Sequence, residues 1–145
     1  MLQRIVAYFG GADTLRSKTI ALWGLAFKAD TDDIRESPAI RLARELMAHG
    51  AHVQAYDPEA IANTKRQLGE MPLITYMDDE LAALQHADAL VIATEWSQFS
   101  AVPLAKVKKL LHKPVIFDGR NMLNIEAVRA AGFYYESIGR AVVKG

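Results

Sequence analysis

Short apolar runs alternate with amphipathic stretches along most of this chain. The runs are nearly continuous in apolar residues, which is typical of strands buried on both faces of a parallel sheet. The expected strands are Thr19–Trp23, His52–Tyr56, Ile74–Tyr76, Ala89–Ala93, Val115–Phe117 and Phe133–Ile138. The expected helices are Pro38–His49, Asp57–Leu68, Asp79–His86, Pro103–Leu111 and Ile125–Ala131. This alternation predicts an α/β fold with a Rossmann-like, doubly wound parallel sheet over residues 18–145.

Residues 1–17 do not fit that alternation. Leu2, Ile5, Val6 and Phe9 recur at the spacing of one helical face, and no capping residue precedes them. We interpret this segment as the end of a longer helix, and the alternative is the frayed first helix of a complete small protein. We expect this apolar stripe to be exposed, which predicts self-association or docking against another domain.

Composition excludes several classes of function. The 145 residues suffice for one domain, and 17 basic residues balance 17 acidic ones, so nucleic acid and anionic membranes are not favoured partners. The cluster Lys106–Lys109 is interpreted as a solvated helix face. The absence of cysteine excludes a cysteine nucleophile, and the four histidines lack metal-ligand spacing. With no secretory signal and no membrane-spanning run, a cytoplasmic location is expected.

The most informative segment is the long charged loop within Gly24–Ile40. It joins the strand Thr19–Trp23 to a helix for which Ser37 is the expected N-cap and Pro38 the first residue. Such loops usually have about 2–6 residues, and this one has about a dozen. Because ligands of α/β proteins bind at the carboxyl ends of the strands, this loop is a candidate binding element.

Three loops at that edge of the sheet contribute charged or aromatic residues. Lys28 follows the first strand, Thr94-Glu95-Trp96 the fourth, and Arg120 the fifth. A lysine and an arginine suit a pyrophosphate, because arginine offers a planar fork and lysine a compact charge. The alternatives are that Lys28 is a solvated loop charge and that Arg120 forms an ion pair with Asp118.

The acidic part of the loop has a simpler interpretation. Asp32, Asp33, Arg35 and Glu36 are expected to form a salt-bridge cluster that shapes the loop. Paired carboxylates also serve acid–base chemistry or magnesium binding, but no accompanying nucleophile is evident.

The usual dinucleotide fingerprint is absent. Gly24 stands alone after the first strand, without the G-x-G-x-x-G pattern. Asp57 is interpreted as a helix N-cap, with a ribose-binding acid as the alternative, and Trp96 as a packing residue, with ligand contact as the alternative. This domain is therefore not expected to hold NAD by itself in the usual way.

The chain resembles the C-terminal, UDP-binding domain of the UDP-glucose/GDP-mannose dehydrogenase family, and within it the UDP-glucose 6-dehydrogenases. The resemblance runs from Lys18 to Arg140. Its motifs are GLAFKADTDDIRESPAI at Gly24–Ile40, AYDP at Ala55–Pro58, TEW at Thr94–Trp96, FDGRN at Phe117–Asn121 and IGR at Ile138–Arg140.

The resemblance implies a UDP-sugar substrate, NAD held mainly by an N-terminal domain of the same polypeptide, and a homodimer formed through a central helix that residues 1–17 would end. It implies that Phe27, Lys28 and Arg120 bind the substrate and that Arg35 reaches towards NAD. The full enzyme would convert UDP-glucose to UDP-glucuronate, reducing two NAD, with catalytic residues outside this sequence. The fragment alone is therefore expected to be inactive.

Other functions remain open at this point. The chain could belong to a related UDP-N-acetylhexosamine or GDP-mannose dehydrogenase, or be a free-standing nucleotide-binding module without catalysis. A phospho-receiver domain is disfavoured, because Asp32 lies about nine residues beyond Trp23 and the fifth-strand loop carries Arg120 instead of lysine.

Overall fold

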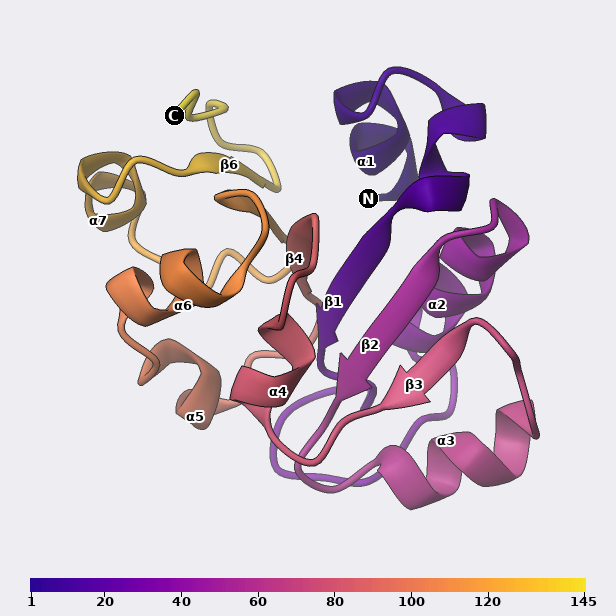
Figure 1. Cartoon of the computed structure of the whole chain (residues 1–145). Coiled ribbons are helices and arrows are strands. Elements are labelled where there is room, and N and C mark those ends of the chain that lie inside the picture. Colours follow the sequence, from indigo (N-terminus) through magenta and orange to yellow (C-terminus); the bar gives the residue numbers. More distant parts are fainter.

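A six-stranded sheet with the order β3-β2-β1-β4-β5-β6 forms the centre of the molecule (Figure 1). The computed structural model describes residues 1–145, with the side chain of Ala12 excepted. The strands are β1 (Thr19–Trp23), β2 (His52–Tyr56), β3 (Ile74–Tyr76), β4 (Ala89–Ile92), β5 (Val115–Asp118) and β6 (Tyr134–Ser137). Every pair of neighbouring strands is parallel, so the predicted α/β, Rossmann-like fold is confirmed.

The helices lie where the amphipathic stretches predict them, with three differences. They are α1 (Leu2–Tyr8), α2 (Pro38–Ala48), α3 (Ile61–Leu68), α4 (Glu80–Leu84), α5 (Ser97–Ser100), α6 (Leu104–Leu110) and α7 (Ile125–Ala130). A turn precedes α3, which begins later than Asp57. The short helix α5 and a 3-10 segment, η1 (Ala12–Ser17), were not anticipated. Both are too short to leave a periodic pattern in the sequence.

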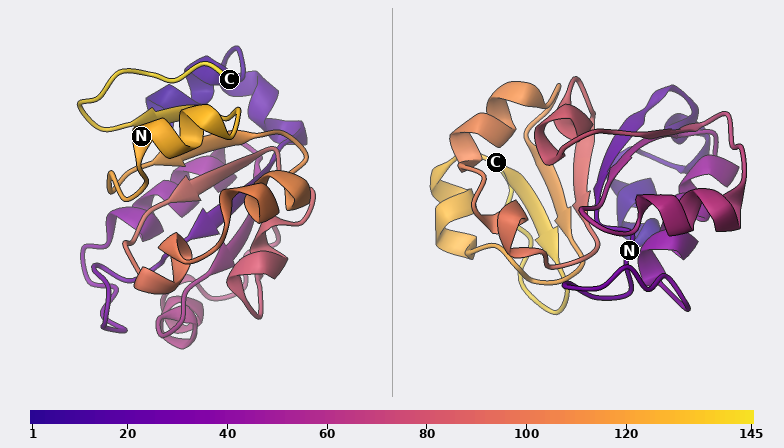
Figure 2. Two further views of the ribbon diagram at one scale, coloured as in Figure 1. Left: turned by 90° about the vertical axis from the view of Figure 1, so that its left-hand side faces the viewer. Right: turned by 90° about the horizontal axis from the view of Figure 1, so that it is seen from below.

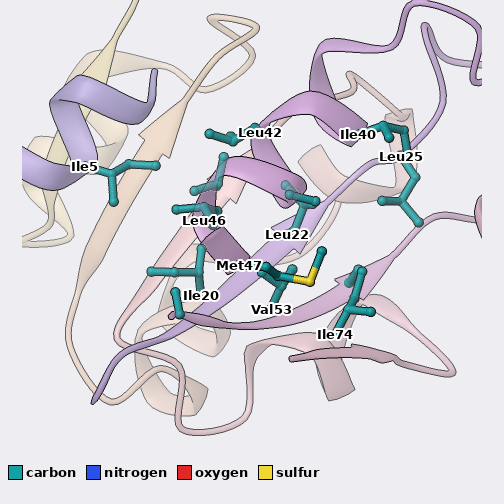
Figure 3. Packing of buried hydrophobic residues seen from close by; sticks show 14 of the residues in the cluster. Ile5, Ile20, Leu22, Leu25, Ile40, Leu42, Leu46, Met47, Val53 and Ile74 are labelled. Atoms are coloured by element: carbon teal, nitrogen blue, oxygen red, sulfur yellow. The ribbon is translucent and has the colours of Figure 1, made fainter. Parts of the chain in front are cut away.

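Helices cover both faces of the sheet (Figure 2). On one face, Ile20, Leu22 and Val53 of the strands pack beneath Leu42 and Leu46 of α2 (Figure 3). On the opposite face, residues of α4 to α7 pack against the strand residues that point to that side, such as Trp23 and Leu90. This burial on both faces explains the nearly continuous apolar strands. None of the described helices is long and apolar enough to cross a membrane.

The N-terminal helix α1 is docked on this domain. Ile5 is completely buried, and Leu2, Val6 and Phe9 are partly buried against the same core. The guanidinium of Arg4 donates to the carbonyl of Ser137 at 2.7 Å. The prediction of an exposed apolar stripe is therefore wrong: α1 covers the part of the sheet that α2 and α3 leave open, over β5 and β6.

The parallel strands bring all their following loops to one edge of the sheet. The long loop after β1 runs along this edge, beneath β1 and β2 in Figure 1. The chain continues from β1 into α2 on one face, and from β4 into α5 on the other. The boundary between β1 and β4 is thus the switch point at which open α/β sheets bind ligands.

Candidate functional site

The switch point itself is filled by the protein. Gly24 has a φ of +106°, and a Cβ placed there would lie 2.3 Å from Thr94 Oγ1. The hydroxyl of Thr94 donates to the carbonyl of Ala26 at 2.9 Å. The loops after β1 and β4 therefore interlock, and the side chain of Thr94 fills the space beside Gly24.

Asp57, at the end of β2, is also engaged within the protein. Its Oδ2 accepts the backbone N–H groups of Leu25 and Ala26 at 2.8 and 2.9 Å and the indole N–H of Trp96 at 3.2 Å. Its Oδ1 accepts two N–H groups of the turn before α3. The prediction that Asp57 is the N-cap of this helix is wrong, because the N-cap of α3 is Ala60; Asp57 instead holds the turn that precedes the helix. Trp96 is buried, as its packing interpretation predicts.

Ser37 is the N-cap residue of α2, as predicted, but its hydroxyl has a different partner from the one expected. It stands before Pro38, at the start of α2, but its hydroxyl makes no capping bond. It donates instead to the carbonyl of Leu25 at 2.8 Å, which ties the end of the long loop to its beginning. Asp30 and Glu36, within the loop, both have positive φ values, a conformation that costs free energy in residues with a Cβ.

Arg120, Glu95 and Phe27 meet at the rim of this edge. The Nε of Arg120 forms an ion pair with Oε2 of Glu95, and its Nη2 lies 3.5 Å from the carbonyl oxygen of Phe27. The side chain of Phe27 is exposed, as is Lys28 beside it. Loops from three strands therefore converge here. The suggested ion pair between the side chains of Arg120 and Asp118 is wrong: Asp118 accepts the backbone N–H of Arg120 at 3.0 Å.

The role of Glu95 was not recognised in the sequence. The hydrogen bond from Arg120 is the main reason that the pKa of Glu95 lies below its ordinary value. The sequence around Glu95 does not indicate this pairing, because Arg120 lies 25 positions further along the chain. The pair holds one edge of the guanidinium.

A cavity of about 330 Å³ adjoins Arg120. It lies between α1, the start of α2 and the carboxyl ends of β4 and β5, and its walls are mostly apolar. The lining residues include Met1, Leu2, Pro38, Leu42, Arg120 and Ile138. Phe27 and Lys28 do not line this cavity. Arg120 is the residue that lines the cavity and also lies next to the carbonyl of Phe27.

Arg35 lies at a different place on the same loop. Its guanidinium forms a two-pronged ion pair with Asp33, with Nη2 and Oδ2 2.8 Å apart, and its side chain is 87% exposed. Arg35 holds the pKa of Asp33 down to about 2. The predicted salt-bridge cluster is thus confirmed for this pair. A groove next to α3, not the cavity at Arg120, borders Arg35.

The acids of the loop do not assemble a metal site. Within the part of the chain that the structure describes, no three histidine, cysteine or acidic residues come together as metal ligands do. The basic cluster Lys106–Lys109 is exposed except for Val107, in agreement with its interpretation as a solvated face.

The fold defines a Rossmann-like domain, with Lys28 and Arg120 at the rim formed by the carboxyl ends of its strands. Residues 21–125 match the UDP binding domain of the UDP-glucose/GDP-mannose dehydrogenase family, and the chain belongs to this family. The recognition made from its motifs is confirmed.

Relatives with established names support this assignment. The chain is 45% identical over 132 residues to UDP-glucose 6-dehydrogenase TuaD of Bacillus subtilis, covering 91% of this chain and 28% of that protein. It is 41% identical over 128 residues to a UDP-glucose 6-dehydrogenase of Pseudomonas aeruginosa, covering 86% and 28%. A solved UDP-glucose dehydrogenase from Pyrobaculum islandicum superposes with a TM-score of 0.77 at 33% identity, covering 97% of this chain and 29% of that chain. The chain therefore spans less than a third of the length of these relatives.

Proposed function

We propose that this chain is the substrate-binding part of an NAD-dependent UDP-glucose 6-dehydrogenase and that it is inactive alone. In this enzyme UDP-glucose would be oxidised to UDP-glucuronate with reduction of two NAD. Three relatives that carry this name are 37–45% identical to the chain, which covers 28–30% of each. The sequence has no cysteine nucleophile, so the catalytic groups would come from another domain of the same polypeptide.

The observation that carries the proposal is the placement of Arg120. Its guanidinium is held by Glu95 on one edge, stands next to the carbonyl of Phe27, and adjoins a cavity with apolar walls. A nucleoside diphosphate has the matching chemistry, because its base and ribose offer flat, partly apolar surfaces and its diphosphate offers oxygens to a guanidinium fork. Lys28 would add a second cation, and the exposed ring of Phe27 would contact the ligand.

NAD is assigned to a neighbouring domain because the residues here do not fit it. Thr94 fills the space beside Gly24, and both oxygens of Asp57 are engaged. Arg35 is exposed and stands on the same long loop as Phe27 and Lys28. By its resemblance to the family, Arg35 would reach towards the cofactor, after exchanging Asp33 for an anionic group of the dinucleotide.

Calorimetric titration of UDP into the purified chain tests this proposal. We expect binding, and we expect Arg120→Ala to weaken it by about tenfold or more, since a charge-assisted hydrogen bond contributes about 1.5–3 kcal/mol. Arg129→Ala is the matched control, because Arg129 also pairs with a glutamate, on α7 and away from the rim. Equal UDP affinity in the wild type and Arg120→Ala would contradict the proposed site.

Turnover is tested separately with UDP-glucose and NAD. We expect no NADH from the chain alone, and measurable NADH formation would contradict the proposed division of labour.

The sugar is a second question with a specific observation behind it. A solved UDP-D-ManNAc dehydrogenase from Pyrococcus horikoshii superposes with a TM-score of 0.72 at 28% identity, only slightly below the UDP-glucose enzyme. Titrations with UDP-glucose, a UDP-N-acetylhexosamine and GDP-mannose distinguish these alternatives. Preference for UDP-glucose agrees with the proposal, and preference for either competitor assigns the chain to a related enzyme.

A further inference from the structure

A buried network lies directly beneath the loop that carries Arg120. Asp118, the last residue of β5, and Tyr135, on β6, are both completely buried. The Tyr135 hydroxyl donates to Asp118 Oδ2 at 2.6 Å. The same carboxylate accepts the backbone N–H of Arg120 at 3.0 Å and that of Leu123 at 2.9 Å. One carboxylate therefore ties both ends of the loop 119–123.

A second set of contacts joins this loop to the segment after β6. The amide of Asn121, which has a φ of +52°, donates to the carbonyl of Ile138 at 2.9 Å and accepts its N–H at 2.8 Å. Arg140 donates to the Tyr135 hydroxyl oxygen and, at 3.3 Å, to the carbonyl of Leu123. The motif Ile138–Arg140, for which the proposed ligand contacts give no role, thus holds the loop from its other side.

The hydrogen bonds of this network run in one direction, from Arg140 through Tyr135 to Asp118. Arg140 donates to the oxygen of Tyr135, whose own O–H donates to Asp118. Burial and the neighbouring carboxylate raise the pKa of Tyr135, so its hydroxyl keeps the proton that it donates. Donors in series polarise one another, so the positive charge of Arg140 supports the buried carboxylate without touching it.

We propose that Tyr135, acting through Asp118, is a positioning residue for Arg120. The carboxylate sets the backbone of the loop, and the loop sets the point from which the guanidinium reaches Glu95 and the ligand. Removing the Tyr135 hydroxyl leaves Asp118 Oδ2 with a single donor, the N–H of Leu123. The inference rests on the proposed function only for the identity of what Arg120 binds.

The test is a double-mutant cycle read by calorimetric titration with UDP. We expect Tyr135→Phe to weaken binding by about fivefold to tenfold in the wild-type background and to have no further effect beside Arg120→Ala. Tyr134→Phe is the matched control. The hydroxyl of Tyr134 donates to Glu136 at 2.9 Å, and the ring of Tyr134 packs on the opposite face of the sheet from Tyr135. An unchanged affinity in Tyr135→Phe, or an equal loss in both backgrounds, would overturn the inference.

Amide hydrogen exchange without nucleotide gives a second, independent readout. We expect the N–H groups of Arg120 and Leu123 to exchange faster in Tyr135→Phe, while those of β4 keep the wild-type rates. If the wild type fails to bind UDP, the proposed function falls, but exchange still decides the positioning role. Unchanged rates at Arg120 and Leu123 would refute it. Should Tyr135→Phe fold poorly, Arg140→Gln removes the far donor, and the same acceleration is expected.

Discussion

Among the glycines, Gly24 has the least room for a side chain, because the loops after β1 and β4 interlock there. A Cβ there would lie 2.3 Å from Oγ1, 2.4 Å from Cβ and 2.6 Å from the backbone nitrogen of Thr94. Trimming Thr94 cannot relieve the last contact, because it is with the main chain. Gly24→Ala therefore forces the ends of β1 and β4 apart.

The size of the effect follows from two terms. A left-handed φ costs an L-residue roughly 1–2 kcal/mol, and overpacking a well-filled site typically costs about 1–3 kcal/mol. We expect Gly24→Ala to lower the free energy of unfolding by about 2–5 kcal/mol. Gly10→Ala isolates the first term, because Gly10 has a φ of +92° and nothing within 4 Å of its Cβ position.

Urea unfolding followed by circular dichroism measures both variants. The midpoint of Gly24→Ala should fall well below that of Gly10→Ala, with similar m-values. If the unfolding free energies of the two variants differ by less than about 0.5 kcal/mol, the loops after β1 and β4 do not approach each other closely. The space beside Gly24 would then be open to a ligand.

Three further predictions concern other parts of the same framework. Asp57→Ala removes the acceptor of five N–H groups, including the Trp96 indole, and should cost about 3–5 kcal/mol of unfolding free energy in urea; a cost below about 1 kcal/mol would contradict the assigned bonds. Because the pKa of Asp33 is lowered to about 2 from its ordinary 3.8, the stabilisation by its ion pair is present above pH 3.8 and lost as the pH falls towards 2. In an NMR titration Arg35→Gln should move this pKa back towards 3.8, and an unmoved pKa would refute the pairing. Ile5→Ala should lower the free energy of unfolding in urea by about 2–4 kcal/mol, whereas an unchanged value would mean that α1 is not docked.

The sequence predicts the sheet well because its strands carry their own signal. Buried strands such as β1 and β4 are short apolar runs, and α2 has a clear helical period with Pro38 at its start. The segments that were missed have no such pattern. The helix α5 has only four residues, and the docking of α1 depends on which part of the sheet the other helices leave uncovered.

The site is only partly readable in the sequence for a related reason. Phe27, Lys28 and Arg120 follow strands whose carboxyl ends share one edge, so their general location follows from topology. The partner of Arg120 does not, because choosing between Glu95 and Asp118 depends on where each carboxylate points. Asp118 faces inward to Tyr135, a contact between two strands that no local pattern reveals.

The most direct test of the proposed site is an NMR titration of the labelled chain with UDP. We expect backbone shifts to concentrate at residues 27–28 and 119–123, and we expect Arg120→Ala to raise the UDP concentration needed to produce them by about tenfold or more. A different hollow, of about 690 Å³, lies beside α3 and the outermost strand β3, with Lys65 and Tyr76 in its lining. Shifts that concentrate there, with residues 119–123 unmoved, would contradict the account.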